Sequence, residues 1–219
     1  MTIPPAEPTS QAAVAAWISG QMRAHDRYAA VFDASERHRI EHGADCDVYA
    51  SSSGPLLGAL VAAAGAKRVL EIGCGLGYSA LWLADGAGPG GTVETCEQVP
   101  LHADLARDQF RAHNAGNRIT IHTARALDVL AGLRGAYDMI FADGDPDEYL
   151  ADLEHFMRLL KPGGTLITSN LFLGVYLPDA PWLADAAEYR RRILDDPRLR
   201  TVFLPEGKAL SVRTDPRRP

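Results

Sequence analysis

The sequence has few cysteines and no long apolar run, and each absence argues against a class of protein. Its three cysteines, Cys46, Cys74 and Cys96, have no metal-ligand spacing, and any disulfide would leave one over. We therefore expect a reducing, cytoplasmic setting. No apolar run reaches about 18 residues, so no transmembrane helix is predicted. The segment Met1 to Ser10 is proline-rich and lacks the basic start and apolar core of a signal peptide.

The chain also lacks an excess of basic residues. Acidic residues number 28 against 22 basic ones, which gives a formal net charge of −6. A protein that binds nucleic acid mainly through phosphate contacts has the opposite balance. We therefore expect neither a nucleic acid nor a membrane as partner. The length of 219 residues suits one sizeable α/β domain with a small appendage.

One stretch, Val69 to Leu81, combines a short apolar run with a glycine turn. The run is typical of a strand buried on both faces. Glu71 interrupts it, and Gly73, Gly75 and Gly77 follow at alternate positions before a helix-compatible segment. Strand, glycine turn and helix let the backbone approach a ligand closely and direct helix N–H groups at it. A carboxylate at Glu71 needs a partner, either a backbone N–H or the ammonium of a ligand.

Apolar runs alternate with helical segments along the rest of the chain. This alternation predicts a doubly wound, mostly parallel sheet with helices on both faces. Two short runs at the end predict a C-terminal antiparallel hairpin, which makes seven strands in all. We expect N-terminal helices over residues 1–43, with the first nine loose, and a second unit over 44–219. Strands are predicted at 69–72, 92–96, 119–123, 137–142, 165–169, 201–204 and 209–213, and helices at 11–42 (interrupted at Gly20), 54–65, 79–84, 100–114, 126–133, 147–160 and 184–194.

Polar residues follow several of these strands. In an open parallel sheet, ligands bind beyond the carboxyl ends of the strands, so Glu97, Asp143 and Asn170 should share an edge with the glycine turn. Glu97 lies 20 residues after Gly77, where a carboxylate accepts hydrogen bonds from both hydroxyls of a ribose. The glycine spacing is Gly-x-Gly-x-Gly and not the Gly-x-Gly-x-x-Gly of the dinucleotide fingerprint, so the turn alone is a weak signal.

Further motifs add to the glycine stretch and Glu97: Tyr78-Ser79 after the last glycine, Tyr137 to Asp143, Leu159 to Gly164, and Ser169-Asn170 followed by Gly174. Together they resemble the class I S-adenosylmethionine-dependent methyltransferases, specifically the small O-methyltransferases related to catechol and caffeoyl-CoA O-methyltransferases. The resemblance covers about Tyr49 to Arg213. It implies a Rossmann-like methyltransferase domain over 44–219, S-adenosyl-L-methionine as cofactor, a small-molecule methyl acceptor and a homodimer.

The resemblance also implies roles for single residues. Glu71 and the glycine turn would hold the methionine end of the cofactor, Ser79 its carboxylate and Glu97 its ribose. Ala126 would lie beside the adenine, and Asp143 would face the reacting centre. The expected cofactor-binding residues are thus Tyr49, Glu71, Gly73, Gly75, Gly77, Tyr78, Ser79, Glu97, Ala126 and Asp143.

Two positions depart from the metal-dependent members of this family. Those members bind Mg²⁺ or Ca²⁺ through an Asp after the fourth strand and an Asp-Asn pair after the fifth, and place a lysine base three residues after the first Asp. Here Asp143 and Asn170 are kept, Ser169 replaces the middle ligand, and Pro146 stands at the lysine position. Hard divalent cations prefer carboxylates, so we expect no requirement for a metal. A weak metal site at Asp143 and Asn170, with Asp145, is the alternative.

Methyl transfer from a sulfonium needs the acceptor held in line and kept dry, and it needs a base only to take a proton from a hydroxyl. We predict Asp143 as the catalytic residue. His25 or His42 is a second candidate if the N-terminal helices fold over the cleft. Tyr176 and Trp182 are candidates for an apolar acceptor pocket. The predicted activity is methyl transfer to a hydroxyl of a small, aromatic molecule.

Three alternatives stay open from the sequence alone. The same cofactor can serve an N-methyltransferase acting on a small molecule or a tRNA base, although the acidic balance disfavours tRNA. A nicotinamide-dependent oxidoreductase has a similar sheet but a different fingerprint spacing. A non-catalytic protein that binds an adenosyl ligand is suggested by the missing lysine.

Overall fold

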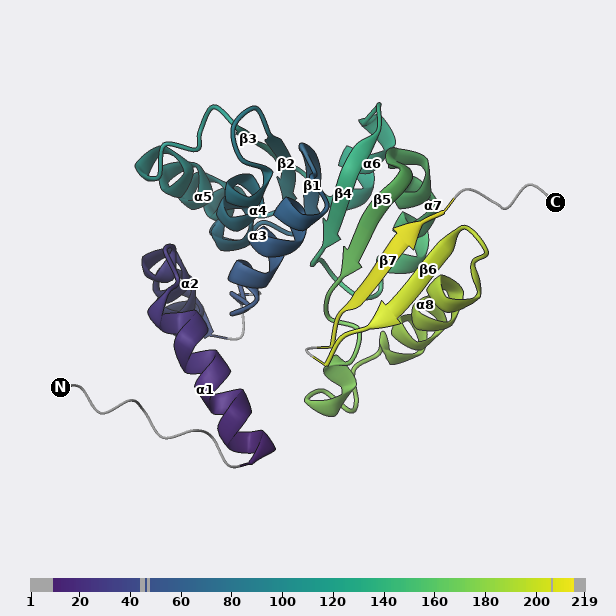
Figure 1. Cartoon of the computed structure of the whole chain (residues 1–219), viewed down its shortest axis with the longest axis horizontal. Coiled ribbons are helices and arrows are strands. Elements are labelled where there is room, and N and C mark those ends of the chain that lie inside the picture. Colours follow the sequence, from purple (N-terminus) through teal and green to yellow (C-terminus); the bar gives the residue numbers. More distant parts are fainter. Residues whose placement is uncertain (1–9, 44–45, 47, 206, 215–219) are drawn as a thin grey trace.

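The computed structural model describes residues 10–43, 46, 48–205 and 207–214. Helices cover both faces of a single sheet (Figure 1). The strands are β1 (Arg68–Ile72), β2 (Thr92–Glu97), β3 (Ile119–Thr123), β4 (Tyr137–Ala142), β5 (Leu160–Thr168), β6 (Leu199–Phe203) and β7 (Ala209–Arg213). The helices are α1 (Gln11–Ala24), α2 (Ala29–His42), α3 (Gly54–Ala63), α4 (Tyr78–Ala87), α5 (Pro100–Ala112), α6 (Ala126–Gly132), α7 (Tyr149–Leu159), the 3₁₀ helix η2 (Leu173–Val175) and α8 (Leu183–Asp195).

The seven strands lie in the order β3-β2-β1-β4-β5-β7-β6. The chain leaves β1 in one direction and returns at β4 to continue in the other, so the crevice of this sheet lies between β1 and β4. Ile72 of β1 is opposite Cys96 of β2 and Ala142 of β4, and Ala142 is opposite Thr168 of β5. The residues that follow these positions share one edge of the sheet: Gly73, Glu97, Asp143 and Ser169.

The two faces of the sheet bury separate cores, because neighbouring residues of a strand point to opposite sides. Val69 and Met139 pack with side chains from α3, α4 and α5. Leu70 and Ile140 pack with side chains from α6, α7 and α8. This arrangement holds the central strands rigidly between two helical layers and so fixes where their carboxyl ends lie.

The C-terminal strands form the predicted hairpin. β7 is antiparallel to both β5 and β6, with Ala209 opposite Thr168 on one side and Phe203 on the other. The turn is closed by a hydrogen bond from the N–H of Leu204 to the carbonyl of Lys208 at 2.8 Å. The predicted Rossmann-like, doubly wound sheet with a C-terminal antiparallel hairpin is confirmed.

The N-terminal region differs from the prediction in one respect. Gly20 lies inside α1, and the helical run is interrupted instead between His25 and Tyr28. There the side chain of Asp26 accepts a hydrogen bond from the N–H of Tyr28 at 2.9 Å, and this local bond competes with continuation of the helix. α1 buries none of its residues, whereas Tyr28 packs edge-on against Trp82 of α4.

The start of β5 also differs from the prediction. The segment Lys161 to Gly164 was expected to separate the preceding helix from the strand, but α7 ends at Leu159 and β5 begins at the next residue. Leu160 pairs with Tyr137, and the register then shifts before Met139 pairs with Thr165. An irregularity of this kind lets a strand absorb extra residues.

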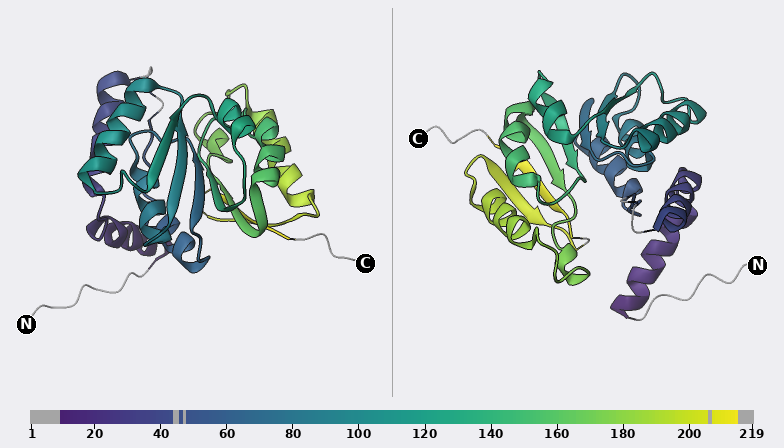
Figure 2. Two further views of the ribbon diagram at one scale, coloured as in Figure 1. Left: turned by 90° about the horizontal axis from the view of Figure 1, so that it is seen from above. Right: turned by 180° about the vertical axis from the view of Figure 1, so that it is seen from behind.

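The N-terminal helices lie on one side of the molecule and the hairpin on the other. Figure 2 shows α2 beside the half that contains α3, α4 and α5, with α1 extending past it, while α8 lies near β6 and β7. Within the described part of the chain, no helix is long and apolar enough to cross a membrane.

Candidate functional site

The glycine turn joins β1 to α4 at the sheet edge. Gly73, Gly75 and Gly77 all have positive φ angles, at 85°, 53° and 93°, which other L residues rarely adopt. A Cβ on Gly73 would lie 2.5 Å from the carbonyl oxygen of Asp143. The turn therefore brings its backbone against the end of β4, and α4 begins directly after it, with its first N–H groups at this edge.

Glu97 fastens this turn to the end of β2. Its two carboxylate oxygens accept hydrogen bonds from the N–H of Gly75 and the N–H of Val99, both at 2.9 Å. Glu97 is only 9% exposed. A carboxylate has about four acceptor positions, so the bonds to the backbone leave capacity for a ligand's hydroxyl groups. The sequence placed Glu97 at this edge but did not indicate that it also holds the glycine turn.

Glu71 is fully buried at the end of β1. One of its oxygens accepts a hydrogen bond from the hydroxyl of Thr95 at 2.6 Å, and the other has no hydrogen-bond partner among the described residues. Burial raises the pKa of Glu71 to about 8, although the nearby hydroxyls of Ser79 and Thr95 favour the carboxylate form. Of these two hydroxyls, only that of Thr95 forms a hydrogen bond with Glu71. A buried acceptor without a donor beside an open glycine turn fits a ligand that brings an ammonium group, as the methionine end of S-adenosyl-L-methionine does.

Asp143 follows β4, and its backbone N–H donates to the carbonyl of Ile72 at 2.8 Å. Asp143 is a partly buried residue, and burial raises the pKa of its carboxyl to about 6. Three neighbours oppose this effect: a hydrogen bond from Ser169, the positive charge of Lys208 and a hydrogen bond from Asn170. Near neutral pH the carboxyl is thus mostly ionised and can accept a proton.

The residues around Asp143 are a poor match for a hard divalent cation. Ser169 and Asn170 both act on the pKa of the Asp143 carboxyl, and the Asn170 amide donates to the carbonyl of Gly144 at 3.3 Å. Both side chains are neutral, where a hard cation would gain affinity from a carboxylate. Mg²⁺ and Ca²⁺ favour oxygen ligands with carboxylates among them. Of Asp143, Ser169 and Asn170 only Asp143 supplies one, and Asp145, the third residue of the alternative site, is exposed.

A second group of possible metal ligands lies beside Glu97. Among the described residues, ligand atoms of His38, Cys46 and His102 lie within 4.8 Å of one another. Burial lowers the pKa of His38, and the charges of His42 and His102 lower it further. Imidazole and thiolate ligands suit softer metals than Mg²⁺. The sequence did not reveal this group, because His102 lies far along the chain from the other two residues.

Neither of the two histidines predicted as alternative bases, His25 and His42, lies at the carboxyl end of a strand. His25 is exposed at the end of α1, where its ring contacts the carbonyl of Gln21 at 2.8 Å. His42 is exposed, and its ring centre lies 4.2 Å from that of His38. Both arrangements are those of surface residues on their own helices.

The remaining predicted cofactor residues differ in exposure. Tyr49 is 68% exposed, and the guanidinium of Arg39 lies over its ring. Tyr78 is buried and donates its hydroxyl to Asp26 at 2.7 Å, which ties the junction of α1 and α2 to α4. Ala126 is partly buried at the first position of α6.

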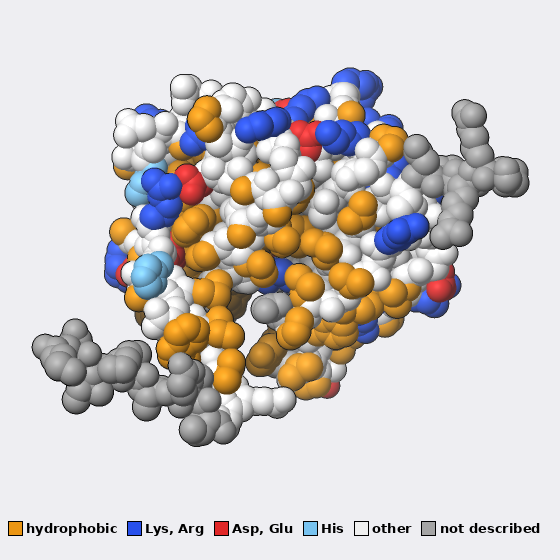
Figure 3. Space-filling view, viewed as in Figure 1, with side chains coloured by type: hydrophobic (Ala, Val, Ile, Leu, Met, Phe, Trp, Pro, Cys, Tyr) orange, Lys and Arg blue, Asp and Glu red, His pale blue; other side chains and the backbone are white. Residues whose placement is uncertain are grey.

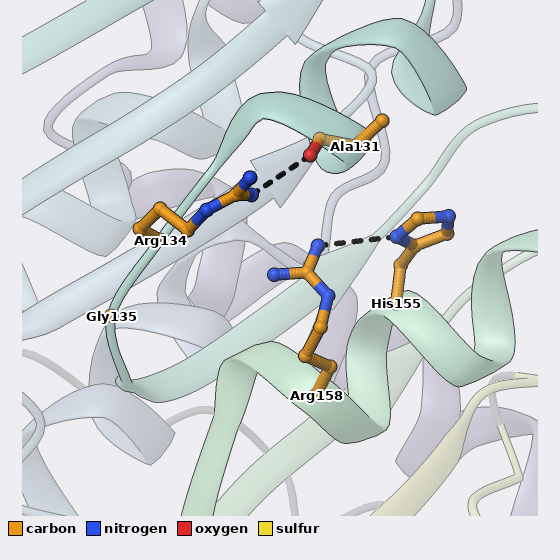
Figure 4. A pocket seen from close by; sticks show the side chains of 5 residues that line it. All are labelled: Ala131, Arg134, Gly135, His155 and Arg158. Atoms are coloured by element: carbon orange, nitrogen blue, oxygen red, sulfur yellow. Dashed lines mark hydrogen bonds between the residues drawn. The ribbon is translucent and has the colours of Figure 1, made fainter.

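A separate hollow lies at the other edge of the sheet, near the amino-terminal end of β4 and away from the glycine turn (Figure 4). It is lined by residues that precede β4 or end α7, and there Arg158 makes a 3.2 Å hydrogen bond with Nδ1 of His155. The guanidinium of Arg158 also donates to the carbonyls of Leu130 and Leu133. His155 is thus held by a surface arginine away from Asp143.

Comparison with known proteins places these features in a family. A family model described as O-methyltransferase matches residues 37–214, which is most of the chain. The chain belongs to the O-methyltransferase family. A catechol O-methyltransferase of Mycobacterium tuberculosis is 34% identical over 165 residues, which cover 75% of this chain and 72% of the relative.

Two solved structures agree with this assignment. The cofactor-bound Rv0187 protein from MTB has a TM-score of 0.78 and 26% identity, covering 95% of this chain and all of that one. The O-methyltransferase from Bacillus cereus in complex with SAH (S-adenosylhomocysteine) has a TM-score of 0.72 and 26% identity, covering 90% of this chain and all of that one. The predictions of an S-adenosylmethionine-dependent O-methyltransferase, of its fold and of its cofactor are confirmed.

Proposed function

We propose that this O-methyltransferase methylates a hydroxyl group of a small aromatic molecule and needs no divalent metal to do so. The observation that carries the proposal is the group around Asp143. The Asp143 carboxyl lies after β4 at the edge of the sheet that carries the glycine turn, its pKa is raised by burial to about 6, and its neighbours Ser169 and Asn170 are neutral where a hard cation favours carboxylates. The M. tuberculosis relative is named for catechol, an aromatic diol, which supports an aromatic acceptor.

Apolar side chains suited to an aromatic acceptor border this part of the molecule. Figure 3 shows hydrophobic side chains on both sides of a hollow between α1 and the segment that follows β5. Large exposed hydrophobic residues come from both, namely Val14, Trp17 and Ile18 of α1 and Phe172, Val175, Tyr176 and Leu177 of the later segment. Exposed apolar groups gathered at a hollow mark ligand or protein contacts.

Different residues are proposed to bind the cofactor and to act on the acceptor. We propose that Tyr49, Glu71, the glycine turn, Tyr78, Ser79, Glu97 and Ala126 hold the cofactor, and that Asp143 faces its reactive end. When bound, S-adenosyl-L-methionine supplies a methyl group on a sulfonium, which is an excellent leaving group. Asp143 orients the acceptor hydroxyl and takes its proton. Its partial burial limits access of water, and holding the acceptor in line supplies much of the rate increase.

We further propose that residues 44–219 form the cofactor-binding domain, that the protein works in the cytoplasm and that it forms a homodimer. All three cysteines are buried as free thiols, which supports a reducing setting. The apolar exposed side chains of α1 support a contact with a second copy.

The proposed function is tested with a panel of phenols, catechols and amines, S-adenosyl-L-methionine and purified protein, with products identified by mass spectrometry. We expect O-methylated phenols, at the same rate with and without a chelator. N-methylated amines alone would favour the N-methyltransferase alternative. Complete loss of turnover in chelator, with recovery on adding Mg²⁺, would contradict metal independence. Asp143→Ala with unchanged kcat on the identified acceptor would exclude its catalytic role.

A further inference from the structure

The C-terminal hairpin carries a buried cation, Lys208. The sequence contains three lysines, Lys67, Lys161 and Lys208. Lys67 and Lys161 lie near the amino-terminal ends of β1 and β5, whereas Lys208 precedes β7 and is only 4% exposed. Lysine is among the residues least often buried, because removing an ammonium from water is costly unless it is paired. Lys208 is therefore a buried cation at the edge of the sheet that carries Asp143 and the glycine turn.

The backbone fixes where this lysine lies. The carbonyl of Lys208 accepts the hydrogen bond from Leu204 that closes the hairpin, and the next residue, Ala209, pairs with Thr168 at the end of β5. Thr168 in turn is opposite Ala142, the residue before Asp143. Lys208 therefore lies at the same edge of the sheet as Asp143, on a strand that is two positions away from β4.

The side chain links the hairpin to the start of α3. Its ammonium donates a hydrogen bond to the hydroxyl oxygen of Ser53 at 3.0 Å, and that oxygen also accepts from the hydroxyl of Ser51 at 2.9 Å. Ser53 is itself buried and lies at the N-terminal boundary of α3. The strand register places Lys208 at the sheet edge that carries Asp143, and its positive charge lowers the pKa of the Asp143 carboxyl.

We propose that Lys208 is a catalytic residue on the acceptor side of the site, where its ammonium stabilises the acceptor oxygen as that oxygen loses its proton. The proposal rests on the proposed O-methylation of a small aromatic hydroxyl. The acceptor O–H proton passes to the carboxylate of Asp143 and later to solvent. The oxygen forms a bond to the methyl carbon, the bond from that carbon to sulfur breaks, and its electron pair stays on sulfur.

The physical basis is electrostatic. Negative charge that develops on a phenolic oxygen is strongly stabilised by a fixed cation in a site that excludes water. An ammonium has three donors on a rotatable stem, so it can contact Ser53 and also turn towards an oxygen. The class of substrate follows: the acceptor is a phenol acidic enough to be bound as its phenolate. Pro146, at the position where related enzymes place a lysine, supplies no cation of its own.

The test combines turnover with a spectroscopic measurement. Lys208→Met, Lys208→Gln and Lys208→Arg are compared with the wild-type enzyme and with Lys67→Met, a matched change at the opposite edge of the sheet. On a phenol that the wild-type enzyme methylates, removing the charge should lower kcat by about 10²- to 10³-fold, as for loss of one oxyanion donor. Affinity for S-adenosylhomocysteine, measured by calorimetry, should stay the same. Lys208→Arg should recover part of kcat, whereas Lys67→Met should match the wild-type enzyme.

A coloured nitrophenol provides the second readout, without turnover. In the presence of S-adenosylhomocysteine and below the pKa of the free phenol, the wild-type enzyme should shift the bound nitrophenol to its phenolate absorption band. Lys208→Met and Lys208→Gln should bind it without this shift. A phenolate band and full kcat in either variant would overturn the proposal. Loss of S-adenosylhomocysteine binding in both neutral variants would also overturn it, by showing a structural role. A wild-type enzyme that methylates amines but no phenol would instead reject the proposed function itself.

Discussion

The N–H of Gly75 donates a hydrogen bond to Oε2 of Glu97 at 2.9 Å, so the glycine turn of β1 depends on a carboxylate at the end of β2. The second oxygen of Glu97 holds Val99 in the same way. Replacing Glu97 by Ala removes both contacts and also any contact with the ribose. Hydrogen bonds to charged groups contribute about 1.5–3 kcal/mol each, so Kd for S-adenosylhomocysteine should rise by roughly 10- to 100-fold or more. Calorimetry measures this.

A control for this substitution is available on the same strand. Glu94 of β2 bonds to Arg68 and Tyr137, towards the other end of the strand. Glu94→Gln should therefore leave cofactor affinity close to that of the wild-type protein. Equal losses in the two variants would mean that damage to β2, rather than loss of the turn contact, weakens binding.

The buried carboxyl of Glu71 predicts that cofactor binding releases a proton. With a pKa of about 8 in the ligand-free protein, Glu71 is mostly protonated at pH 7. A bound ammonium favours the carboxylate and lowers this pKa, so a proton leaves to the buffer when S-adenosylhomocysteine binds below pH 8. Calorimetry at pH 7 in buffers of different ionisation enthalpy should show this release.

Comparison with Glu71→Gln isolates the group responsible. That variant should bind more weakly, and its binding enthalpy should show less proton release than the wild-type protein. Asp152→Asn, which changes another buried carboxyl, should keep the full release. Identical proton release in wild-type protein and Glu71→Gln would show that Glu71 does not contact the ammonium group.

The serine at position 169 leads to a prediction about the affinity of the site for Mg²⁺. Ser169→Asp places a second carboxylate next to Asp143 and Asn170, which completes the set of ligands that the family resemblance implies for metal-dependent members. The variant should bind Mg²⁺ at least about 10-fold more tightly than the wild-type protein, because hard cations gain affinity from added carboxylates. Titration with Mg²⁺ monitored by thermal unfolding measures this. An equally strong response of the wild-type protein would show that its own donor set already holds the cation.

Much of the fold and of the cofactor edge was predictable from local sequence. The buried strands are short apolar runs bounded by turns, and Gly73 to Gly77, Glu97 and Asp143 follow them directly. Their meeting at one edge is a consequence of parallel pairing. The positive φ angles of the three glycines likewise follow from a turn that only glycine adopts easily.

What the sequence could not show depends on distant contacts. Lys208 lies in a tight turn, where a lysine is ordinarily solvated, and its burial depends on Ser53, which lies far along the chain. The break between α1 and α2 likewise was placed at Gly20, although the side chain of Asp26 sets it. In both cases a specific side-chain hydrogen bond decides the outcome, and no periodic pattern reports it.

Replacing the buried carboxyl of Asp152 by an amide is expected to stabilise the protein at high pH. Asp152 is buried in the first turn of α7, and neither of its carboxyl oxygens has a hydrogen-bond partner among the described residues. Burial, and then the negative charge of Glu148, raises its pKa from 3.8 to about 7. The folded protein therefore binds this proton more tightly than the unfolded chain does. The stabilisation that comes from this bound proton is complete below about pH 4 and is lost as the pH rises through 7.

Asp152→Asn removes this dependence, because the amide stays neutral. We expect little change in Tm at pH 4 and an increase of about 10 °C at pH 8, because a pKa difference of about three units at about 1.4 kcal/mol per unit corresponds to roughly 4 kcal/mol, and 1 kcal/mol corresponds to roughly 2–4 °C in a chain of this size. Asp128→Asn, in the exposed first turn of α6, is the matched control and should change Tm little at either pH. A gain at pH 8 that equals the gain at pH 4 would mean that packing of the amide, rather than removal of a buried charge, stabilises the variant.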